Sequence, residues 1–456
     1  MTALLYLLGV VVFVVAILAS IGLHELGHLI PAKRFGGKVT QYFIGFGPTV
    51  WSKRVGETEY GVKAIPLGGY VKIIGMLPPG AEQLVEETEE VLDAQGNTVT
   101  QVRVRKSNTG MFTQLISDAR AAEWELIQPE DADRLFYKMP SWKKIVVMAG
   151  GPTVNIAIAF LIFTGVFATF GNPADPDIET TVAEVQACIV PPDEDGRACT
   201  AEELKSSPAP AHEAGIEVGD EFVSFNGVEV TDWKQLQTLI RANGDEQATV
   251  VVDRDGELVT LHTATTVTPR FLEVGDTEPE PVGFLGVRPV ATPTTGGPIY
   301  TIDQMGSMTV EVVKSLATLP AKVWDVAQAI VGLEERDPAG PVSIVGGGRL
   351  AGETAAHTEI DLQSKVVSLL LLIAGFNFFI GMFNFVPLLP LDGGHIASAA
   401  WEGIRRGIAR LRRRPDPGYV DAAKLLPVAY VVASAILVLG IVLIVGDLVV
   451  PVHLES

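Results

Sequence analysis

The sequence predicts a multi-pass α-helical membrane protein with four transmembrane helices and a separate β-rich domain. Hydrophobic residues make up 48% of the 456 residues and the mean hydropathy is +0.31, which is too apolar for an ordinary soluble protein. Four segments without a charged residue are long enough to cross a hydrocarbon core of about 30 Å. Between the second and third segments, short apolar runs alternate with turn residues, as in a compact β domain. The four segments are Met1–Leu23, Ile145–Ala174, Val366–Leu391 and Leu425–Gly446.

The first segment has one feature of a cleaved signal peptide. Small residues at Ala16–Ala19 resemble a cleavage region, but no Lys or Arg precedes the apolar run, which is also too long. We therefore interpret it as a retained span. The formal net charge of −20 argues against nucleic-acid binding.

The distribution of Lys and Arg around the spans predicts their orientation. Basic residues gather after the first span, before the second, and between the third and fourth, whereas both chain ends lack them. Because basic loops stay in the cytoplasm, segments 31–143 and 392–424 are predicted inside, and both termini and 175–365 outside. The basic residues are Lys33, Arg34, Lys38, Lys138, Lys143, Lys144, Arg405, Arg406, Arg410, Arg412, Arg413, Arg414 and Lys424.

The end of the first span carries a candidate metal site. His24 and His28 lie one helical turn apart, so two imidazoles can bind one metal ion from the same helix face. Glu25 follows the first histidine, where its carboxylate can act on an activated water rather than on the metal. Ionisable groups in an apolar helix are costly and mark functional sites. Chance HExxH sequences are common, so a metal site also needs a third ligand from elsewhere in the chain.

That partner is predicted at the end of the third span. The first and third spans run in the same direction, so Asp392 can reach the depth of His24 and His28. Two imidazoles and one carboxylate suit Zn²⁺ with a fourth position for water. His395 is a rival ligand, or a group that supports a ligand. Asn384 is expected either to bind a substrate backbone or oxyanion, or to make an interhelical hydrogen bond.

The segment after the first span reads as a membrane-associated β-hairpin on the cytoplasmic side. Gly45–Lys53 and Glu59–Lys72 are short apolar runs separated by a turn. An edge near Gly68, Gly69 and Tyr70 is expected to hold an extended peptide, and a purely structural turn is the alternative. Residues 78–108 are acidic and polar and are predicted to be a flexible insertion. In the second span, Gly150 and Gly151 are expected to allow close helix approach. Asn155 is expected either to make an interhelical hydrogen bond or to contact substrate.

The outside segment is predicted to be a compact β-rich domain. A strand at Thr181–Val185, a helical turn and strand in Ala211–Asn226, and a helix at Trp233–Ala242 precede strands Thr249–Val252 and Leu258–Thr263. Gly283–Val287 is expected to be the closing strand. This order of elements resembles a PDZ domain of the bacterial protease type. A peptide-binding groove, a steric filter and a structural module all stay open. Cys188 and Cys199, the two cysteines of the chain, are predicted to form a disulfide there, with free thiols as the alternative.

Residues 306–333 have apolar positions at helical spacing and predict an amphipathic helix on the outer membrane surface. Gly340–Ser343 and Gly346–Gly348 are expected to form a turn back to the third span. The predicted organisation is a first span with HExxH at 1–35, a β-hairpin region at 36–77, a cytoplasmic loop at 78–143, a second span at 144–174, a PDZ-like domain at 175–290, a helical and Gly-rich connector at 291–365, a third span at 366–392, a basic cytoplasmic loop at 393–424 and a fourth span at 425–450.

The paired motifs resemble those of the site-2 proteases, in particular the RseP-like bacterial intramembrane zinc metalloproteases, over nearly the whole chain. The motifs are His24-Glu25-Leu26-Gly27-His28, Asn384 to Gly394 with Leu391-Asp392-Gly393-Gly394, Gly45-Phe46-Gly47-Pro48, Pro66 to Tyr70, and Gly151-Pro152 to Asn155. The resemblance implies His24, His28 and Asp392 as zinc ligands and Glu25 as catalytic base. It also implies that the hairpin and Asn384 engage substrate. The chain departs from many RseP relatives in having one PDZ-like unit rather than two.

The function expected is hydrolysis of a peptide bond inside the transmembrane segment of another protein in the bacterial plasma membrane. By resemblance, the substrate is a single-pass protein such as an anti-sigma factor, or a remnant signal peptide. A metal-binding transporter is the main rival, but it should show internal repeats, and none is seen in the sequence. A membrane-anchored PDZ scaffold is the third hypothesis, and it leaves the buried Glu25 unexplained.

Overall fold

The computed structural model describes residues 2–78, 87–92, 98–103, 111–124, 127–192, 197–272 and 279–453. The chain divides into two compact units. The first, here called the membrane unit, comprises Met1–Val166 and Gly297–Ser456, and the second, the β-rich unit, comprises Phe167–Gly296. Each is described by itself below.

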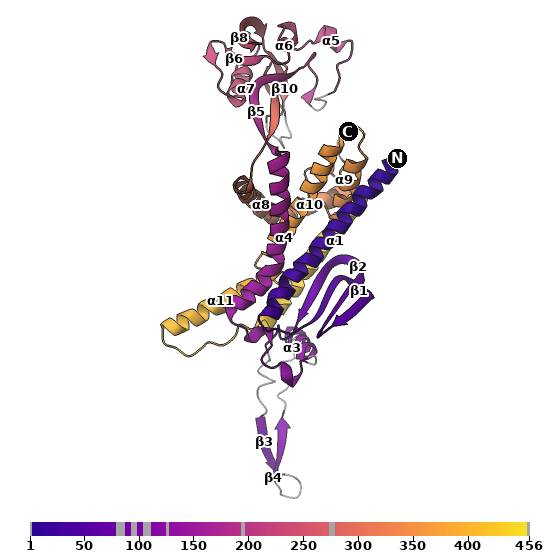
Figure 1. The fold of residues 1–456 in the computed structure, drawn as a ribbon, viewed down its shortest axis with the longest axis vertical. Coiled ribbons are helices and arrows are strands. Elements are labelled where there is room, and N and C mark those ends of the chain that lie inside the picture. Colours follow the sequence, from indigo (N-terminus) through magenta and orange to yellow (C-terminus); the bar gives the residue numbers. More distant parts are fainter. Residues whose placement is uncertain are drawn as a thin grey trace. The chain divides into compact units, whose positions relative to one another are not determined.

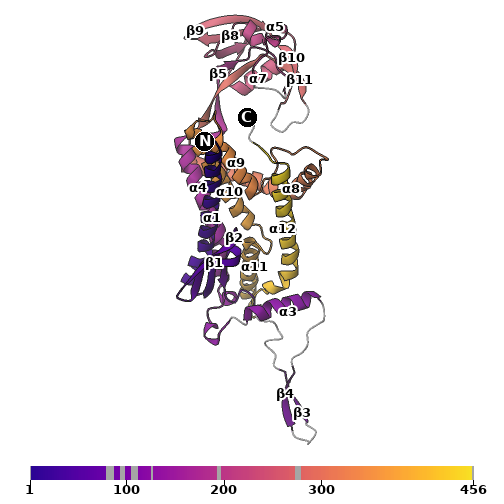
Figure 2. The ribbon, with the colours of Figure 1, turned by 90° about the vertical axis from the view of Figure 1, so that its right-hand side faces the viewer.

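Four helices of the described chain are long and apolar enough to cross a membrane, so the predicted number of spans is confirmed. They are α1 (Thr2–Arg34), α4 (Ser141–Thr169), α10 (Leu362–Asn384) and the segment Ala422–Val449, which contains α12 (Leu426–Val449) (Figures 1 and 2). The third span ends at Asn384 rather than at Leu391. Pro387 and Pro390 explain this, because proline lacks a backbone N–H and disfavours helix in the preceding residue.

The predicted glycine turn before the third span is wrong for its second half. Gly340–Ser343 lie in a loop, but Gly346–Gly348 lie inside helix α9 (Ile344–Ala356). The Ser343 hydroxyl accepts a hydrogen bond from the Val345 N–H at 3.1 Å and caps this helix. A Cβ on Gly347 would come within 2.9 Å of both Phe376 and Phe13. The glycines therefore allow close packing of α9 on α10 and α1 instead of forming a loop.

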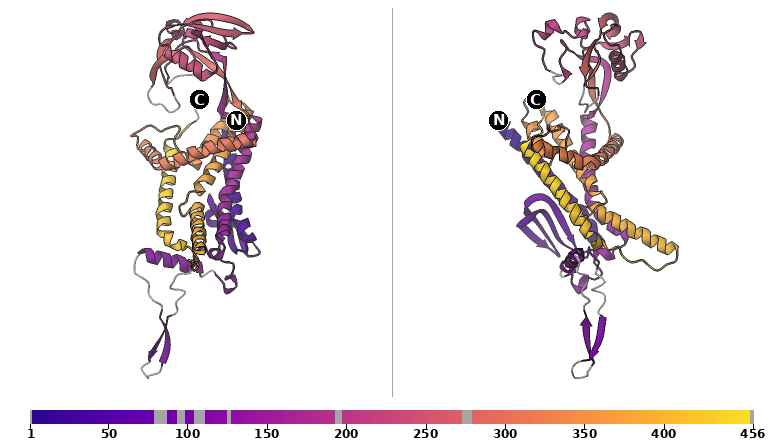
Figure 3. Two further views of the ribbon diagram at one scale, coloured as in Figure 1. Left: turned by 90° about the vertical axis from the view of Figure 1, so that its left-hand side faces the viewer. Right: turned by 180° about the vertical axis from the view of Figure 1, so that it is seen from behind.

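The amphipathic segment forms helix α8 (Pro298–Ile330), as the apolar spacing predicted (Figure 3). A buried carboxylate joins the chain after α8 to the end of α12. Asp447 accepts hydrogen bonds from the Ser343 N–H at 2.6 Å and the Gly346 N–H at 3.2 Å, and pairs with Arg336 at 3.2 Å. Asp447 is only 1% exposed, so these bonds satisfy a carboxylate that would otherwise be costly to bury.

The predicted hairpin is formed by two long antiparallel strands, β1 (Val39–Val55) and β2 (Thr58–Ile73). Gly45 and Gly47 have positive φ values that let β1 bend sharply. Before the bend, residues 41–44 pair with both halves of β2, with 59–62 on one side and 69–72 on the other. Within the described residues, 69–72 therefore form an outer edge of a small curled sheet.

The insertion contains more structure than the sequence indicated. Strands β3 (Glu87–Leu92) and β4 (Thr98–Arg103) pair as a hairpin, and helix α3 (Met111–Trp124) follows. The rest of the predicted flexible segment 78–108, apart from residue 78, lies outside the described residues. The chain then passes through two short 3-10 turns at Pro129–Asp131 and Phe136–Lys138 before α4. After the third span, α11 (Asp392–Leu411) leads to a 3-10 turn at Ala422–Leu425.

The β-rich unit has a main sheet of order β12-β5-β6-β8-β9, with β7 paired to β6, and a separate β10–β11 pair. Its core is apolar and includes Phe222, Phe225, Leu236 and Val250, all at most 2% exposed. The elements are β5 (Asn172–Val185), α5 (Glu203–Ser206), α6 (Pro210–Glu213), β6 (Glu221–Phe225), β7 (Val228–Glu229), α7 (Trp233–Ala242), β8 (Gln247–Arg254), β9 (Glu257–Ala264), β10 (Thr266–Arg270), β11 (Glu280–Phe284) and β12 (Val287–Thr294).

The helix predicted at Trp233–Ala242 has those bounds in the structure, and the β-rich nature of this segment is confirmed. The single closing strand expected at Gly283–Val287 is wrong. Gly286 has φ +90°, which breaks the run, so β11 ends at Phe284 and β12 begins at Val287. The two strands consequently pair with different neighbours, β10 and β5.

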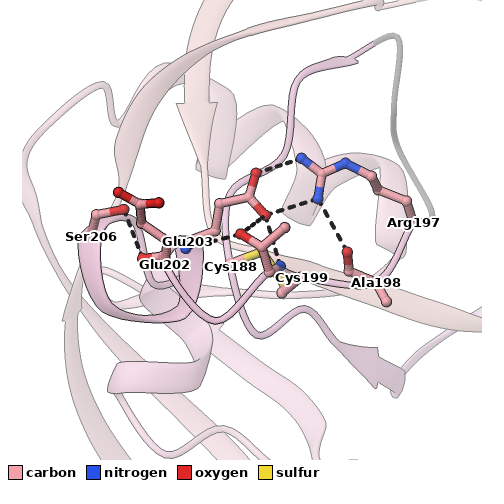
Figure 4. A network of polar contacts seen from close by, with 8 residues as sticks. Cys188, Arg197, Ala198, Cys199, Glu202, Glu203 and Ser206 are labelled. Atoms are coloured by element: carbon pink, nitrogen blue, oxygen red, sulfur yellow. Dashed lines mark hydrogen bonds and ion pairs between the residues drawn. A yellow bond between two sulfur atoms is a disulfide. The ribbon is translucent and has the colours of Figure 1, made fainter.

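A disulfide joins Cys188 to Cys199 in the loop that follows β5. Beside it, Arg197 donates two hydrogen bonds to Glu203, and Glu203 also accepts from the Thr200 N–H (Figure 4). These bonds hold the pKa of Glu203 down at about 2. The loop is therefore closed by one covalent bond and one ion pair.

Candidate metal centre

Helix α1 supplies three of the predicted site residues in two adjacent turns. His24 and His28 lie on one face, and their Nε2 atoms are 3.2 Å apart. Glu25 is 8% exposed and His28 is 6% exposed, although both lie in a helix whose sequence is otherwise apolar. The polar groups therefore face the protein interior, as a functional site in a membrane helix requires.

Asp392 reaches both histidines, although it lies more than 360 residues later in the chain. Its Oδ2 is 3.4 Å from His24 Nε2 and 3.3 Å from His28 Nε2. A tetrahedral zinc ion with bonds of about 2.0–2.1 Å needs ligand atoms about 3.3–3.4 Å apart. Among the described residues, these three form the group of His, Cys, Asp or Glu that can share one ion. The donor set and the spacing both fit zinc.

The glycines after Asp392 explain how the chain places this carboxylate. Asp392 is the first residue of α11, directly after the proline-rich loop that follows α10. A Cβ on Gly393 would come 2.2 Å from the Val386 carbonyl oxygen, and one on Gly394 would come 2.5 Å from the Leu389 nitrogen. Only glycine lets the first turn of α11 fold this closely onto the loop.

His28 is oriented by a backbone group of helix α4. Its Nδ1 lies 2.8 Å from the Val147 carbonyl oxygen, which is a hydrogen-bond acceptor. The Nδ1 proton is therefore donated to Val147, and Nε2 keeps its lone pair for a metal. Val147 was not predicted as a site residue, because a carbonyl contribution leaves no side-chain signal in the sequence.

Helix α4 crosses α1 at very short range through three glycines. A Cβ on Gly150 would lie 1.9 Å from the Gly27 carbonyl oxygen. A Cβ on Gly151 would lie 2.3 Å from His28 Nε2 and 2.7 Å from His24 Nε2. The sequence predicted close helix approach at Gly150 and Gly151, but only the structure shows that Gly151 faces the histidine nitrogens.

The outer edge of the curled sheet lies against Glu25. A Cβ on Gly69 would come 2.9 Å from Glu25 Cγ, so the strand backbone contacts the side chain of the predicted base. Tyr70 stacks on Phe43 with ring centroids 5.6 Å apart, which stabilises the strand beside the site. The edge near Gly68, Gly69 and Tyr70 is thus placed at the candidate metal centre.

One cavity of about 390 Å³ brings the predicted site residues together. Asn155 is 1% exposed, and its Oδ1 has no hydrogen-bond partner among the described residues. Asn384 donates from Nδ2 to the Ile380 carbonyl oxygen of its own helix at 3.1 Å, rather than to another helix. The predicted residues that line the cavity are His24, Glu25, His28, Gly68, Gly69, Tyr70, Asn155, Asn384 and Asp392.

His395 also lines this cavity, but it is not a member of the group that can share one ion. The remaining wall is apolar and was not predicted, because an apolar residue near a site gives the same sequence pattern as one in a core. It is formed by Ile21, Val71, Ile73, Met76, Met148, Ile380 and Pro390.

Comparison with known proteins agrees with this geometry. Residues 12–415 match peptidase family M50. The chain belongs to this family. It is 34% identical to the zinc metalloprotease Rip1 of Mycobacterium tuberculosis (strain ATCC 25618 / H37Rv), over 99% of both chains. It is also 34% identical to Rip1 of Mycolicibacterium smegmatis, over 97% of this chain and 98% of the relative.

A more distant relative is the zinc metalloprotease RasP of Bacillus licheniformis, with 26% identity over 87% of this chain and 90% of the relative. The resemblance stated from the motifs is therefore confirmed, and so is the expectation of a metallopeptidase. Membership of a peptidase family over most of the chain leaves the transporter and scaffold hypotheses without support.

Proposed function

We propose that this protein is an intramembrane zinc metalloprotease that cleaves single-pass membrane proteins within their transmembrane segments. The observation that carries the proposal is the triangle of His24 Nε2, His28 Nε2 and Asp392 Oδ2, with sides of 3.2–3.4 Å, beside Glu25 and between helices that span a membrane. The cofactor is zinc, which the names of the relatives also carry. The ligands are His24, His28 and Asp392.

The residues divide the chemistry between them. Bound zinc acts as a Lewis acid that acidifies water and polarises a carbonyl group. Glu25, which lines the same cavity and lies against the hairpin strand, takes the proton from the attacking water and returns it to the leaving amine. His28 is held in the correct orientation by the Val147 carbonyl, which removes the freedom to rotate away.

A transmembrane substrate must unwind before it can be cleaved, because a helix hides its amides in internal hydrogen bonds. The outer edge at 69–72 offers backbone groups to which an extended segment can pair. The unpaired Oδ1 of Asn155 in the cavity can accept a substrate N–H, which supports the substrate-contact hypothesis for this residue. Asn384 has its Nδ2 bonded to its own helix, so its Oδ1 is the atom we assign to substrate.

The proposed orientation follows from the basic loops, with both termini and the β-rich unit outside the bacterial plasma membrane and the metal centre toward the cytoplasm. The substrates are anti-sigma factors or remnant signal peptides, already shortened on the outside. The β-rich unit is proposed to be a PDZ domain that selects such shortened chains, with a peptide groove and a steric filter as its two modes of action.

The deciding experiment replaces Glu25 by Gln and measures bound zinc together with cleavage of a single-pass substrate in vesicles. We expect Glu25→Gln to keep one zinc per chain while the cleavage rate falls by about 10²–10⁴-fold, the usual contribution of a general base. Asp392→Asn should instead lose zinc and cleavage together. Wild-type cleavage rates in Glu25→Gln would refute the mechanism, and zinc retention in Asp392→Asn would refute the ligand set.

A further inference from the structure

A second cavity of the membrane unit lies between α11 and α12 and has no role in the proposed catalysis. Its volume is about 720 Å³, within the range of about 300–1,000 Å³ of small-molecule sites. We call it the α11–α12 cleft. It is lined by residues of the loop before Asp392, of α11 and of the start of the last span, among them Leu388, Leu389, Trp401, Arg405, Lys424 and Val428.

The walls of the cleft expose large apolar side chains. Trp401 is 56% exposed, Val428 is 53% exposed and Leu388 is 46% exposed. The apolar row continues along α11 as Ile404, Ile408 and Leu411, at helical spacing from Trp401. Helix α11 runs outward from α1 and α4 (Figure 1). Ile404, Ile408 and Leu411 are 52%, 45% and 85% exposed, so this row is not covered. Such a surface on a membrane protein is suited to hydrocarbon.

The mouth of the cleft is basic, although the whole chain carries a net charge of −20. Arg405 and Lys424 line it, and the Nη2 of Arg405 donates a hydrogen bond to the Pro417 carbonyl oxygen. The one carboxylate in the lining, Asp421, pairs with Arg120. Nearby, no carboxylate in the described part of the chain forms an ion pair with the exposed arginines Arg410, Arg412, Arg413 and Arg414.

We propose that the α11–α12 cleft binds an anionic phospholipid of the cytoplasmic leaflet. An acyl chain lies along Leu388, Trp401 and Val428, and the phosphate is bound by Arg405 and Lys424, with the further arginines of α11 near the headgroup layer. The proposal rests on the membrane orientation given above. A substrate segment fits this mouth less well, because residues that flank the cytoplasmic ends of membrane spans are themselves rich in Lys and Arg.

The lipid would contact the loop that carries the metal ligand. Leu388 and Leu389 lie three or four residues before Asp392, and the Gly394 N–H bonds to the Leu391 carbonyl at 3.0 Å. Because Gly393 and Gly394 pack tightly on this loop, lipid in the cleft supports the same backbone that places the Asp392 carboxylate. The position of the Asp392 carboxylate therefore depends on which lipids the cytoplasmic leaflet contains, although the lipid does not contact the metal.

The test measures quenching of Trp401 by brominated lipid. The full-length protein is reconstituted in phosphatidylcholine vesicles with a small fraction of either brominated phosphatidylglycerol or brominated phosphatidylcholine. The signal of Trp401 is the difference between wild type and Trp401→Phe, because the chain has six tryptophans. We expect the anionic lipid to quench Trp401 at a much lower mole fraction than the neutral one.

Arg405→Gln/Lys424→Gln should reduce this preference about 30-fold, because each basic side chain near an anionic surface contributes about 1 kcal/mol. Lys205→Gln/Lys234→Gln changes the net charge equally in exposed residues of the β-rich unit and should leave the preference unchanged.

Equal quenching by the two lipids would overturn the proposal. So would a preference that survives Arg405→Gln/Lys424→Gln, or displacement of both lipids alike by a single-pass substrate peptide, which would assign the cleft to substrate. The measurement needs neither zinc nor cleavage, so it can be repeated in Glu25→Gln. A failure of the proposed proteolysis therefore leaves this test intact.

Discussion

Gly151 shows how a single residue without a side chain decides whether the metal centre can form. It lies on α4, where a Cβ would stand 2.3 Å from His28 Nε2 and 2.7 Å from His24 Nε2. Both distances are shorter than van der Waals contact, and both neighbours are proposed ligand atoms. A Cβ on the adjacent Gly150 would lie 1.9 Å from the Gly27 carbonyl oxygen, so the backbones of α4 and α1 are in close contact at this turn.

We predict that Gly151→Ala abolishes zinc binding, because the new methyl group occupies the space beside the two nitrogen ligands. Bound zinc per purified chain, measured by elemental analysis, should fall from one to a small fraction, and cleavage should fall with it. Gly165→Ala is the matched control. Gly165 lies on the same helix as Gly151, and a Cβ there meets nothing within 4 Å. Full zinc content in Gly151→Ala would show that the helices can separate.

At the scale of elements, a buried ion pair fixes α11 against α4. Lys144 donates to both carboxylate oxygens of Glu402, at 3.0 and 2.9 Å, and the two side chains are 6% and 2% exposed. Glu402 also accepts a hydrogen bond from the Val420 N–H at 3.1 Å and pairs with Arg406 at 3.2 Å. The helix that begins with Asp392 is thereby attached to the helix whose Val147 carbonyl orients His28.

We predict that Glu402→Gln destabilises the membrane unit by about 3–5 kcal/mol, because removal of one partner leaves Lys144 charged and buried. Lys144→Met/Glu402→Leu should recover most of this loss, since it removes both charges and keeps the volume. Thermal unfolding in one detergent gives the comparison, with zinc retention against a chelator as the second readout. A Glu402→Gln protein as stable as wild type would show that the pair contributes little.

At the scale of the whole molecule, the two units are stabilised by different means. The membrane unit packs glycine-rich helices and buries a few ion pairs, whereas the β-rich unit has an apolar core between its sheet and α7. A buried carboxylate also stabilises the β-rich unit. Asp220 is 1% exposed and accepts from Arg254 Nε and Nη2 at 2.7 and 2.8 Å, and from the Glu217 N–H at 2.9 Å.

This carboxylate predicts an acid-sensitive stability of the β-rich unit. Burial alone would raise the pKa of Asp220, but the hydrogen bonds from Arg254 and Glu217 outweigh it and lower the pKa below its usual value. The stabilisation is therefore present above the unfolded pKa of about 3.9 and is lost as the pH falls through the lower folded pKa.

Hydrogen exchange of the full-length protein should show β6 and β8 losing protection below about pH 4. Asp220→Asn should lower the local unfolding free energy by about 2 kcal/mol at neutral pH and flatten this pH dependence. Glu229→Gln, at an exposed position of the same unit, is the control and should change neither. An unchanged acid profile in Asp220→Asn would assign the effect to other carboxylates.

The sequence by itself determined the four spans, the β-hairpin, the helix at Trp233–Ala242 and the residues of the candidate metal centre. These follow from local patterns, because hydropathy, the i, i+4 spacing of His24 and His28 and the turn residues act over short distances. Predictions from the sequence were wrong or incomplete where contacts between residues far apart in the chain determine the structure. Gly346–Gly348 lie in helix α9, where Phe13 and Phe376 pack against Gly347, and Gly151 and Val147 joined the site only through the crossing of α4 with α1. Whether Asp392 would meet the two histidines was likewise decided by tertiary structure, because that distance depends on how several helices pack together.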